Sequence, residues 1–242
     1  MMTTDKDPMG AAIADYWKHG VAGRLRVFSP DFDEDEIPVE TLFRSFEEMP
    51  ALEQEALRLA AGRILDVGAG AGCHSLALQE MGKDVTAVEI SPLSAQTMRE
   101  QGVANVLQQD FFTLDSSFDT ILMLMNGIGI VGTLDRLPRF FRHIRSILSP
   151  GGQLLLDSSD LCYLFEDEEG IIELPDSQRY YGELEYRMQY KKIKGDPFPW
   201  LYIDEDTLTA EAAKAGFTAE VIARGEHYEY LARLKDQRLL KA

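Results

Sequence analysis

Short apolar runs alternate with amphipathic segments through the middle of this chain. The apolar runs predict buried strands, and each is followed by apolar residues at helical spacing. The expected strands are residues 63–68, 84–91, 103–110, 118–126 and 153–159, and the helices among them are residues 72–82, 92–102 and 134–152. Strands and helices that alternate in this way predict a doubly wound α/β sheet whose strands are mostly parallel.

Towards the C-terminus the pattern changes. Residues 182–192 alternate strictly between apolar and polar positions, which indicates a strand with one solvated face. Residues 204–217 predict a capped helix. Residues 218–236 hold two apolar runs around Arg224 and Gly225, which fit either a bent strand or a hairpin.

The N-terminal part predicts helices joined by a loop. Residues 10–20 read as a short amphipathic helix that ends at Gly20, and residues 38–62 as one or two helices. Between them, residues 29–38 form an acidic segment bounded by prolines, which we expect to be a solvated loop. Because no repeat or linker interrupts the chain, we expect a single domain.

Charge and cysteine content narrow the class of protein. The chain has 242 residues and a formal net charge of -17, which argues against a polyanionic partner such as nucleic acid. Two cysteines are too few for a disulfide framework, and the N-terminus does not resemble a signal peptide. The longest apolar run, residues 121–132, is shorter than the ~20 residues that cross a bilayer. We expect a cytoplasmic protein that binds neither nucleic acid nor membrane.

The segment ILDVGAGAG, residues 64–72, points to a binding site. Gly68, Gly70 and Gly72 alternate with small residues directly after an expected strand. Glycines let a ligand approach the main chain with no Cβ in the way, and we expect several backbone N–H groups before the next helix to be unpaired. A tight turn needs only one glycine, so three favour a ligand-binding loop.

The spacing of this loop argues against a dinucleotide. The dinucleotide fingerprint is G-x-G-x-x-G, whereas here Cys73 stands where the third glycine would be. Asp66, two residues before the first glycine, would repel a pyrophosphate and favour an ammonium or sulfonium centre. The same carboxylate could instead accept hydrogen bonds from the N–H groups of the loop, which is compatible with either ligand.

Four segments together resemble class I S-adenosylmethionine-dependent methyltransferases. ILDVGAGAG resembles the first motif of that family, and VTAVEIS, VLQQDF and LSPGGQLLLD resemble its later motifs in the same order. The resemblance covers roughly residues 63–157. It implies a Rossmann-like fold with a seven-stranded, mostly parallel sheet, helices on both faces and an antiparallel C-terminal strand. We expect one domain, 1–242, with a helical N-terminal lid (1–62), a cofactor-binding core (63–160) and a substrate-side segment (161–242).

The resemblance also implies the residues that bind S-adenosylmethionine. Glu89 matches the acid that holds the ribose hydroxyls, Ile90 the apolar residue on the adenine, and Asp110 the acid near the adenine amino group. The expected cofactor-binding residues are Asp66, Gly68, Ala69, Gly70, Gly72, Glu89, Ile90, Asp110, Phe111, Met125 and Tyr16.

Simpler roles stay open for several of these residues. Glu89 could be an ordinary charge at a strand end, and Asp110 could cap the segment that follows it. Tyr16 could pack in the core instead of closing over the cofactor. Arg44 could meet the carboxylate of the cofactor or form a surface ion pair.

The acceptor side is expected beyond the fourth and fifth strands, where ligands bind in doubly wound sheets. Asn126 is the predicted catalytic residue, because an Asn at the end of an apolar strand must find a polar partner. It could alternatively cap the next turn. The following Gly-Ile-Gly departs from the two prolines and aromatic residue of the amino-methylating branches, which argues against a nucleobase or glutamine acceptor. The expected substrate-side residues are Asp157, Ser158, Asp160, Tyr163 and, as a candidate base, His227.

The sequence therefore predicts methyl transfer from S-adenosylmethionine to a small-molecule acceptor by in-line displacement, with no metal site. One alternative is a protein that binds the cofactor without catalysis, as a sensor or partner subunit. A nicotinamide-dependent oxidoreductase is a further alternative, which the glycine spacing and Asp66 disfavour.

Overall fold

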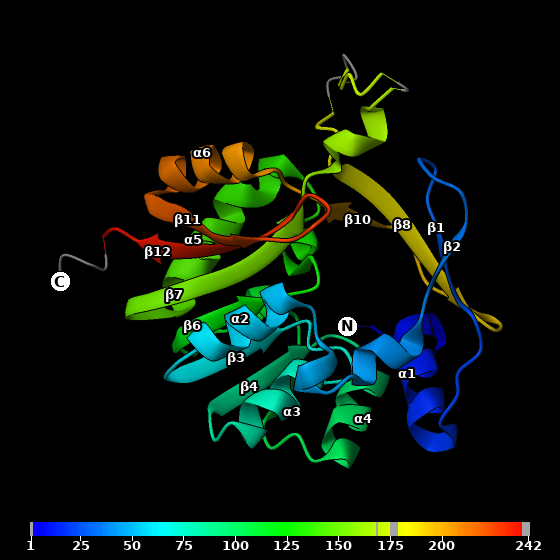
Figure 1. Ribbon diagram of the computed structural model, residues 1–242. Coiled ribbons are helices and arrows are strands. Elements are labelled where there is room, and N and C mark those ends of the chain that lie inside the picture. Colours follow the sequence, from blue (N-terminus) through cyan, green and yellow to red (C-terminus); the bar gives the residue numbers. More distant parts are fainter. Residues whose placement is uncertain (1, 168, 175–178, 239–242) are drawn as a thin grey trace.

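A seven-stranded sheet forms the centre of the protein, which we describe from a computed structural model over residues 2–167, 169–174 and 179–238 (Figure 1). The strand order is β11-β12-β7-β6-β3-β4-β5. The strands are β3 (Arg63–Val67), β4 (Asp84–Glu89), β5 (Val106–Gln108), β6 (Phe118–Met123), β7 (Leu148–Ser159), β11 (Phe217–Arg224) and β12 (Glu229–Asp236). The pairs from β7 to β5 are parallel, whereas β12 pairs antiparallel with both β7 and β11. The predicted fold class is confirmed, and residues 218–236 form a hairpin, not a bent strand.

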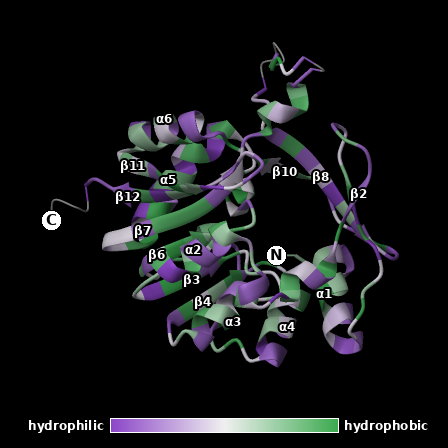
Figure 2. Ribbon diagram, in the orientation of Figure 1, coloured by the Kyte–Doolittle hydropathy of each residue, from purple (hydrophilic) through white to green (hydrophobic). Residues whose placement is uncertain are grey.

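Helices cover both faces of this sheet. They are α1 (Pro8–His19), α2 (Ala51–Leu59), α3 (Cys73–Glu80), α4 (Pro92–Gln101), α5 (Leu137–Ile147) and α6 (Glu205–Ala215). Leu65 and Leu154 join the core under α5 and α6, whereas their chain neighbours Ile64 and Leu155 join the core under α2 and α3. Successive side chains of a strand point to opposite faces, which explains why these strands are apolar throughout. Figure 2 shows this apolar character along the middle of β7.

Short 3-10 helices connect several of these elements. They are η1 (Thr4–Lys6), η2 (Val39–Phe43), η3 (Phe46–Glu48), η4 (Phe111–Thr113), η5 (Gly127–Val131), η6 (Leu134–Arg136) and η7 (Leu161–Phe165). Within the described ranges, no helix combines the length and the apolar content that crossing a membrane requires.

The sequence did not predict the second, smaller sheet. Its strands β1 (Leu25–Phe28), β2 (Asp35–Ile37), β8 (Glu183–Tyr190) and β10 (Phe198–Leu201) have the order β10-β8-β1-β2, and β9 (Ile193–Lys194) pairs with β8. Figure 1 shows this sheet beside the main one, with α1 in contact with both α4 and β8. It joins two segments of the chain that lie about 160 residues apart, since Leu25 pairs with Tyr190.

The N-terminal lid therefore contains two strands that were not predicted, and the expectation of a loop throughout residues 29–38 is wrong. Acidic side chains of that segment pair with two arginines, one directly before β1 and one within it: Arg24 Nε lies 2.5 Å from Glu36, and Arg26 is paired with Glu34. The ion pairs and the antiparallel pairing of β1 with β2 together hold this acidic segment in position. An alternation only three residues long gives too weak a signal to predict such a strand.

Candidate active site

The glycine loop joins β3 to α3 and exposes main chain. Gly68 and Gly70 have φ angles of +68° and +57°, in the left-handed region that favours glycine. A Cβ built on Gly68 would meet nothing within 4 Å, and one on Gly70 would meet only a backbone oxygen at 4.0 Å. A Cβ on Gly72 would instead lie 2.9 Å from Met98 of α4. The first two glycines thus face open space, and the third permits close helix packing.

The prediction of unpaired N–H groups is wrong for most of this loop. Gly68 and Ala69 donate to the carbonyl of Val88, and Gly72 donates to the carbonyl of Ala69. Gly70 donates to a carboxylate oxygen of Glu89 at 3.0 Å. The loop is closed onto the neighbouring strand β4, so a ligand here would meet glycine Cα atoms instead of a row of free donors.

Glu89 lies at the end of β4, directly beside this loop. One carboxylate oxygen accepts from Gly70 and the other accepts from the Ser91 N–H at 2.8 Å. Burial raises the pKa of Glu89, although these N–H groups oppose the shift. The side chain of Ile90 is 42% exposed on the same strand end, so an apolar surface is available next to the carboxylate. The predicted ribose and adenine contacts are therefore compatible with the geometry and stay predictions.

Asp66 is held under the loop and does not cap it. Its carboxylate is buried and accepts a hydrogen bond from the Ser75 hydroxyl of α3 at 2.7 Å. Burial raises the pKa of Asp66, against the opposing effect of nearby His74. The side chain thus ties β3 to α3 and fixes the start of the loop.

A buried chain of charges next to Asp66 was not predicted. Glu53 of α2 accepts hydrogen bonds from Arg44 and, at 2.6 Å, from His74 Nε2. The three side chains are at most 11% exposed. Burial opposes protonation of His74, but the hydrogen bond to Glu53 and the charge of Asp66 outweigh it and raise its pKa. Arg44 does form an ion pair, as one alternative predicted, but the pair with Glu53 is buried and does not lie at the surface.

Asp110 and Phe111 have structural roles in η4. Asp110 accepts from the Phe112 N–H at 2.9 Å, so the capping alternative is confirmed, and the residue is exposed to solvent. The ring of Phe111 is 3% exposed and packs edge-on against His143 in the core. The ring is therefore part of the core, and a contact of Phe111 with the cofactor through its main chain stays a prediction.

Helix α1 is fastened over the cofactor side of the sheet. The buried carboxylate of Asp7 caps α1 through Gly10 and also accepts from the Ser91 hydroxyl at 2.6 Å, two residues after Glu89. Tyr16 of α1 packs against Phe43 with the rings tilted and their centroids 4.7 Å apart, and it remains partly exposed. The packing alternative for Tyr16 is realised, and its contact with the cofactor stays a prediction. The Asp-Pro pair predicts the cap locally, but no local signal predicts the contact with Ser91.

A strained corner follows β6 on the acceptor side. Met125 and Asn126 both have left-handed backbones, with φ angles of +58° and +56°. Such conformations cost about 1–3 kcal/mol in non-glycine residues and persist when surrounding contacts hold them. Here the Asp157 carboxylate on β7 accepts from the N–H of Met125 at 3.0 Å and of Asn126 at 2.6 Å. Met125 is 41% exposed at this corner.

The Asn126 side chain acts as a tie between elements. Its amide donates to the carbonyl of Leu201 at 3.2 Å, and its oxygen accepts from the Ser158 hydroxyl at 2.9 Å. Ser158 also accepts from the Ile203 N–H at 3.0 Å. Asn126 does not cap η5 with its side chain, so that alternative is wrong. Ser158 is 2% exposed, and its hydrogen bonds join β7 to Asn126 and to the segment after β10. The prediction that Ser158 faces the acceptor is therefore wrong.

The remaining acceptor-side predictions fall on the rim of the site. Asp160 accepts from the Cys162 N–H at 2.9 Å and from the Tyr181 hydroxyl at 2.7 Å. Tyr163 is 42% exposed and stacks on Tyr228, with centroids 5.5 Å apart. His227 is exposed in the turn between β11 and β12, so its role as a base stays a prediction.

Comparison with known proteins agrees with this arrangement. The chain matches the family described as Methyltransferase domain over residues 40–221, about three quarters of its length. It is also 57% identical to a SAM-dependent methyltransferase from Bacteroides fragilis, crystallised with S-adenosyl-L-homocysteine, at a TM-score of 0.92. That match covers 98% of this chain and 97% of the other. The chain belongs to the methyltransferase domain family.

Curated relatives of this methyltransferase match over a shorter stretch. The cypemycin N-terminal methyltransferase of a Streptomyces species is 32% identical over 102 residues. A ubiquinone biosynthesis O-methyltransferase of Xanthomonas euvesicatoria is 29% identical over 114 residues. The chain spans 42% and 45% of the length of these two relatives. The predicted resemblance to class I methyltransferases is confirmed.

Proposed function

We propose that this methyltransferase transfers a methyl group from S-adenosylmethionine to a small-molecule acceptor. The observation that carries the proposal is the bare main chain at Gly68 and Gly70, which faces open space beside the carboxylate of Glu89. A side chain would fill that space, so the loop is shaped for a ligand that touches the backbone.

The residues present fit this cofactor. A carboxylate accepts two ribose hydroxyls at once and would oppose a 2′-phosphate, which suits Glu89. The exposed face of Ile90 can cover an adenine ring. The related protein from Bacteroides fragilis holds S-adenosyl-L-homocysteine, which supports the same ligand here. The buried acids Asp66 and Glu89 disfavour a dinucleotide pyrophosphate in this loop.

The residues of the acceptor side chiefly position the reactants. S-adenosylmethionine supplies a methyl group that is already activated on a sulfonium, so the chain contributes orientation and exclusion of water. Asp157 fixes the corner that presents Met125, and the ties from Asn126 to Ser158 and Leu201 hold that corner against the second sheet. Asn126 is therefore a positioning residue in this proposal, and its direct contact with the acceptor stays a prediction.

Calorimetry tests the choice of cofactor. We expect S-adenosylhomocysteine to bind and NADH not to bind, because the glycine spacing and the acidic residues suit only the first. Binding of NADH alone would favour the oxidoreductase. Binding of S-adenosylhomocysteine without methyl transfer to any small molecule would favour the sensor or partner subunit.

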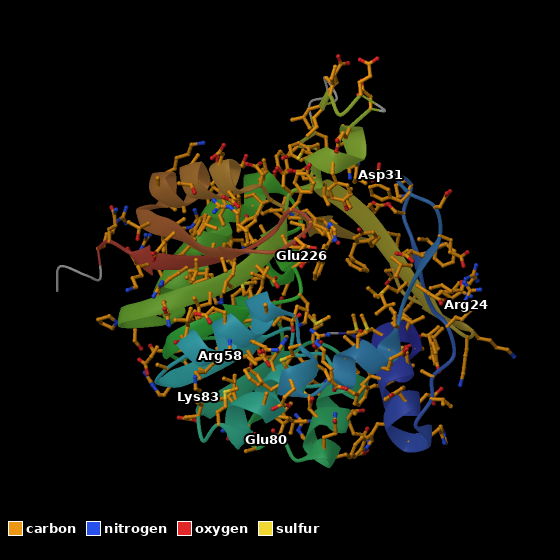
Figure 3. All side chains as sticks on the ribbon, viewed as in Figure 1. Arg24, Asp31, Arg58, Glu80, Lys83 and Glu226 are labelled. Carbon is orange, nitrogen blue, oxygen red and sulfur yellow. The ribbon has the colours of Figure 1, made fainter. Side chains whose placement is uncertain are left out.

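A matched pair of variants tests the assignment of Glu89. We expect Glu89→Gln to weaken binding of S-adenosylhomocysteine by about 1–3 kcal/mol, the usual scale for hydrogen bonds to a charged group. Glu80→Gln is the control, because it removes the same charge at the exposed end of α3, away from the loop (Figure 3). Equal affinities of the two variants would contradict the assignment.

A cytoplasmic location and the lack of a nucleic-acid partner also stay predictions of the sequence. They rest on the formal net charge of -17 and on the two cysteines.

A further inference from the structure

Four tyrosines from separate elements gather on the acceptor side. Tyr163 of η7 stacks on Tyr228, which has a left-handed backbone with a φ of +62°. The Tyr186 hydroxyl of β8 lies 3.4 Å from the Tyr202 hydroxyl, after β10. Hydrogen bonds link the two pairs: the Tyr181 hydroxyl donates to Asp160, directly before η7, and the Tyr202 N–H donates to the carbonyl of Gly182 at 2.7 Å. We call these four residues the tyrosine cluster.

The tyrosine cluster is anchored to the corner after β6. The residues on either side of Tyr202 make these links: Leu201 accepts from Asn126, and Ile203 donates to Ser158. The carbonyl of Tyr228 accepts from the Asp160 N–H at 3.1 Å. Figure 1 shows the turn between β11 and β12 pointing towards the second sheet, and Figure 3 labels Glu226 within that turn. The cluster therefore stands beyond the carboxyl ends of β6 and β7.

The charged groups that act on this cluster include several carboxylates. Glu166, burial and Asp160 raise the pKa of Tyr228. Burial, the other phenols and Asp35 raise the pKa of Tyr186. Tyr163 and Tyr228 are 42% and 46% exposed, and main-chain hydrogen bonds join Glu166 to Tyr163 and Asp160 to Tyr228. Aromatic faces beside carboxylates attract organic cations, and a net charge of -17 attracts them from solution.

We propose that the acceptor is an amine, that it binds as an ammonium ion against the tyrosine cluster, and that the Asp157 carboxylate takes its proton before methyl transfer. This inference rests on the proposed function. The carboxylate of Asp157 accepts from the N–H groups of Met125 and Asn126, and the side chain of Asn126 in turn donates to Leu201, the residue before Tyr202.

The atoms balance in this scheme. The ammonium gives one proton to Asp157, and the nitrogen lone pair then forms a bond to the methyl carbon. The carbon–sulfur bond breaks with its electron pair on sulfur, and the product leaves as a methylated ammonium or releases a second proton to solvent. Asp157 returns its proton to solvent before the next turnover.

The pKa of Asp157 suits a group that accepts a proton from the ammonium ion. Burial raises its pKa to about 7, the N–H groups of Asn126 and Met125 oppose the rise, Glu53 adds to it, and His74 opposes it. A base that titrates near neutral pH can accept a proton and release it again. The groups that act on Asp157 thus come from the corner after β6, from α2 and from α3.

Methylation of a metabolite extract tests the inference without requiring an identified acceptor. The protein and tritiated S-adenosylmethionine are incubated with small molecules from Bacteroides fragilis, whose methyltransferase is 57% identical. We expect a labelled product that binds a cation exchanger at pH 7 and resists alkaline hydrolysis. At high pH the product should no longer bind the exchanger, unless its nitrogen is quaternary. A neutral or anionic product, or a base-labile methyl ester, would overturn the amine proposal and leave methyl transfer standing. Absence of any labelled product, with S-adenosylhomocysteine bound, would overturn the proposed function itself.

Variants then test the residues with the extract as substrate. Glu166→Gln should lower the rate at limiting extract about threefold to tenfold, whereas Glu185→Gln, on the exposed face of β8, should leave it unchanged. For Asp157→Asn we expect a rate reduced at least a hundredfold below pH 8 and partly recovered at higher pH, where the amine is already neutral. Asp157→Glu, which keeps the carboxylate, should retain part of the rate at pH 7. Equal loss in both Asp157 variants at every pH would overturn the role of Asp157 as the base.

Discussion

The two halves of the site are built by different means. The cofactor half, Gly68–Gly72 with Glu89, is closed by hydrogen bonds between residues at most 30 positions apart, such as Gly70 with Glu89. The acceptor half joins Asn126 to Leu201, 75 positions away, and Ser158 to Ile203, 45 positions away. A short motif can therefore encode the first half, whereas the second exists only once the small sheet has formed. It follows that cofactor binding and acceptor binding can be damaged separately.

The largest effect is expected from the buried charge chain behind the cofactor half. Glu53→Gln would leave the buried guanidinium of Arg44 and the imidazole of His74 without their shared carboxylate. Breaking a buried ion pair by removing one partner costs about 3–5 kcal/mol. We expect urea unfolding at pH 7 to show a loss of this size in the free energy of unfolding.

Glu55→Gln is the matched control, because Glu55 lies on the same helix in an exposed pair with Arg58. Exposed pairs contribute about 0–1 kcal/mol, so this variant should unfold almost like the parent. The comparison also has a pH signature. The pKa of His74 is raised in the folded state, so its contribution is complete below its ordinary pKa and is lost as the pH rises through the folded value. Similar losses in both variants would contradict the buried network.

The same contrast explains what could be predicted from the sequence. Gly68 and Glu89 stand in motifs whose chemistry is local, so their neighbourhood was predictable. Ser158 and Asn126 sit at the predicted strand ends, but their partners come from the segment after β10, which no local pattern connects to them. The alternating pattern places Tyr186 on the apolar face of a strand, without any indication that it meets Tyr202.

Errors on the cofactor half have a different cause. The expectation of free N–H groups in the loop follows from the general rule that a strand-to-helix turn leaves donors unpaired. The carbonyl of Val88 and the carboxylate of Glu89 on the adjacent strand take up three of them, at Gly68, Ala69 and Gly70. The sequence does not reveal that β4 lies beside the loop. The hydrogen-bond partners of the loop N–H groups are therefore known only from the tertiary structure.

An intermediate effect is expected at the acceptor half, from the pH dependence of stability. The pKa of Asp157 is about 7 when folded, above its ordinary value of 3.8, because the carboxyl is buried. The folded state therefore binds the proton more tightly, and this contribution is present below about pH 4 and lost as the pH rises to about 7. Each pKa unit corresponds to about 1.4 kcal/mol, so we expect about 2–3 kcal/mol across this window after allowing for partial exposure.

Urea unfolding of the parent and of Asp157→Asn between pH 4 and pH 8 measures this contribution. The amide cannot ionise, so the difference in stability between the two proteins should change across the window in favour of the variant at high pH. Asp66 and Glu89 titrate in both proteins and cancel in the difference. Parallel curves would show that Asp157 is ionised throughout, and the acceptor half would then hold a fixed charge.

The smallest effect on the free energy of unfolding is expected when either of two glycines with the same backbone geometry is replaced by alanine. Only one of the two replacements should affect cofactor binding. Gly68 and Gly82 have φ angles of +68° and +73°, and a Cβ on either would meet nothing within 4 Å. An alanine in this left-handed region costs about 1–2 kcal/mol, so Gly68→Ala and Gly82→Ala should lower the free energy of unfolding equally. Only Gly68→Ala places a methyl group where the proposed cofactor would touch the main chain, so calorimetry should show at least a tenfold loss of S-adenosylhomocysteine affinity in that variant alone. If both variants bound it like the parent, the open space at Gly68 would be a turn without a ligand, and the cofactor half would have to be sought elsewhere along the strand ends.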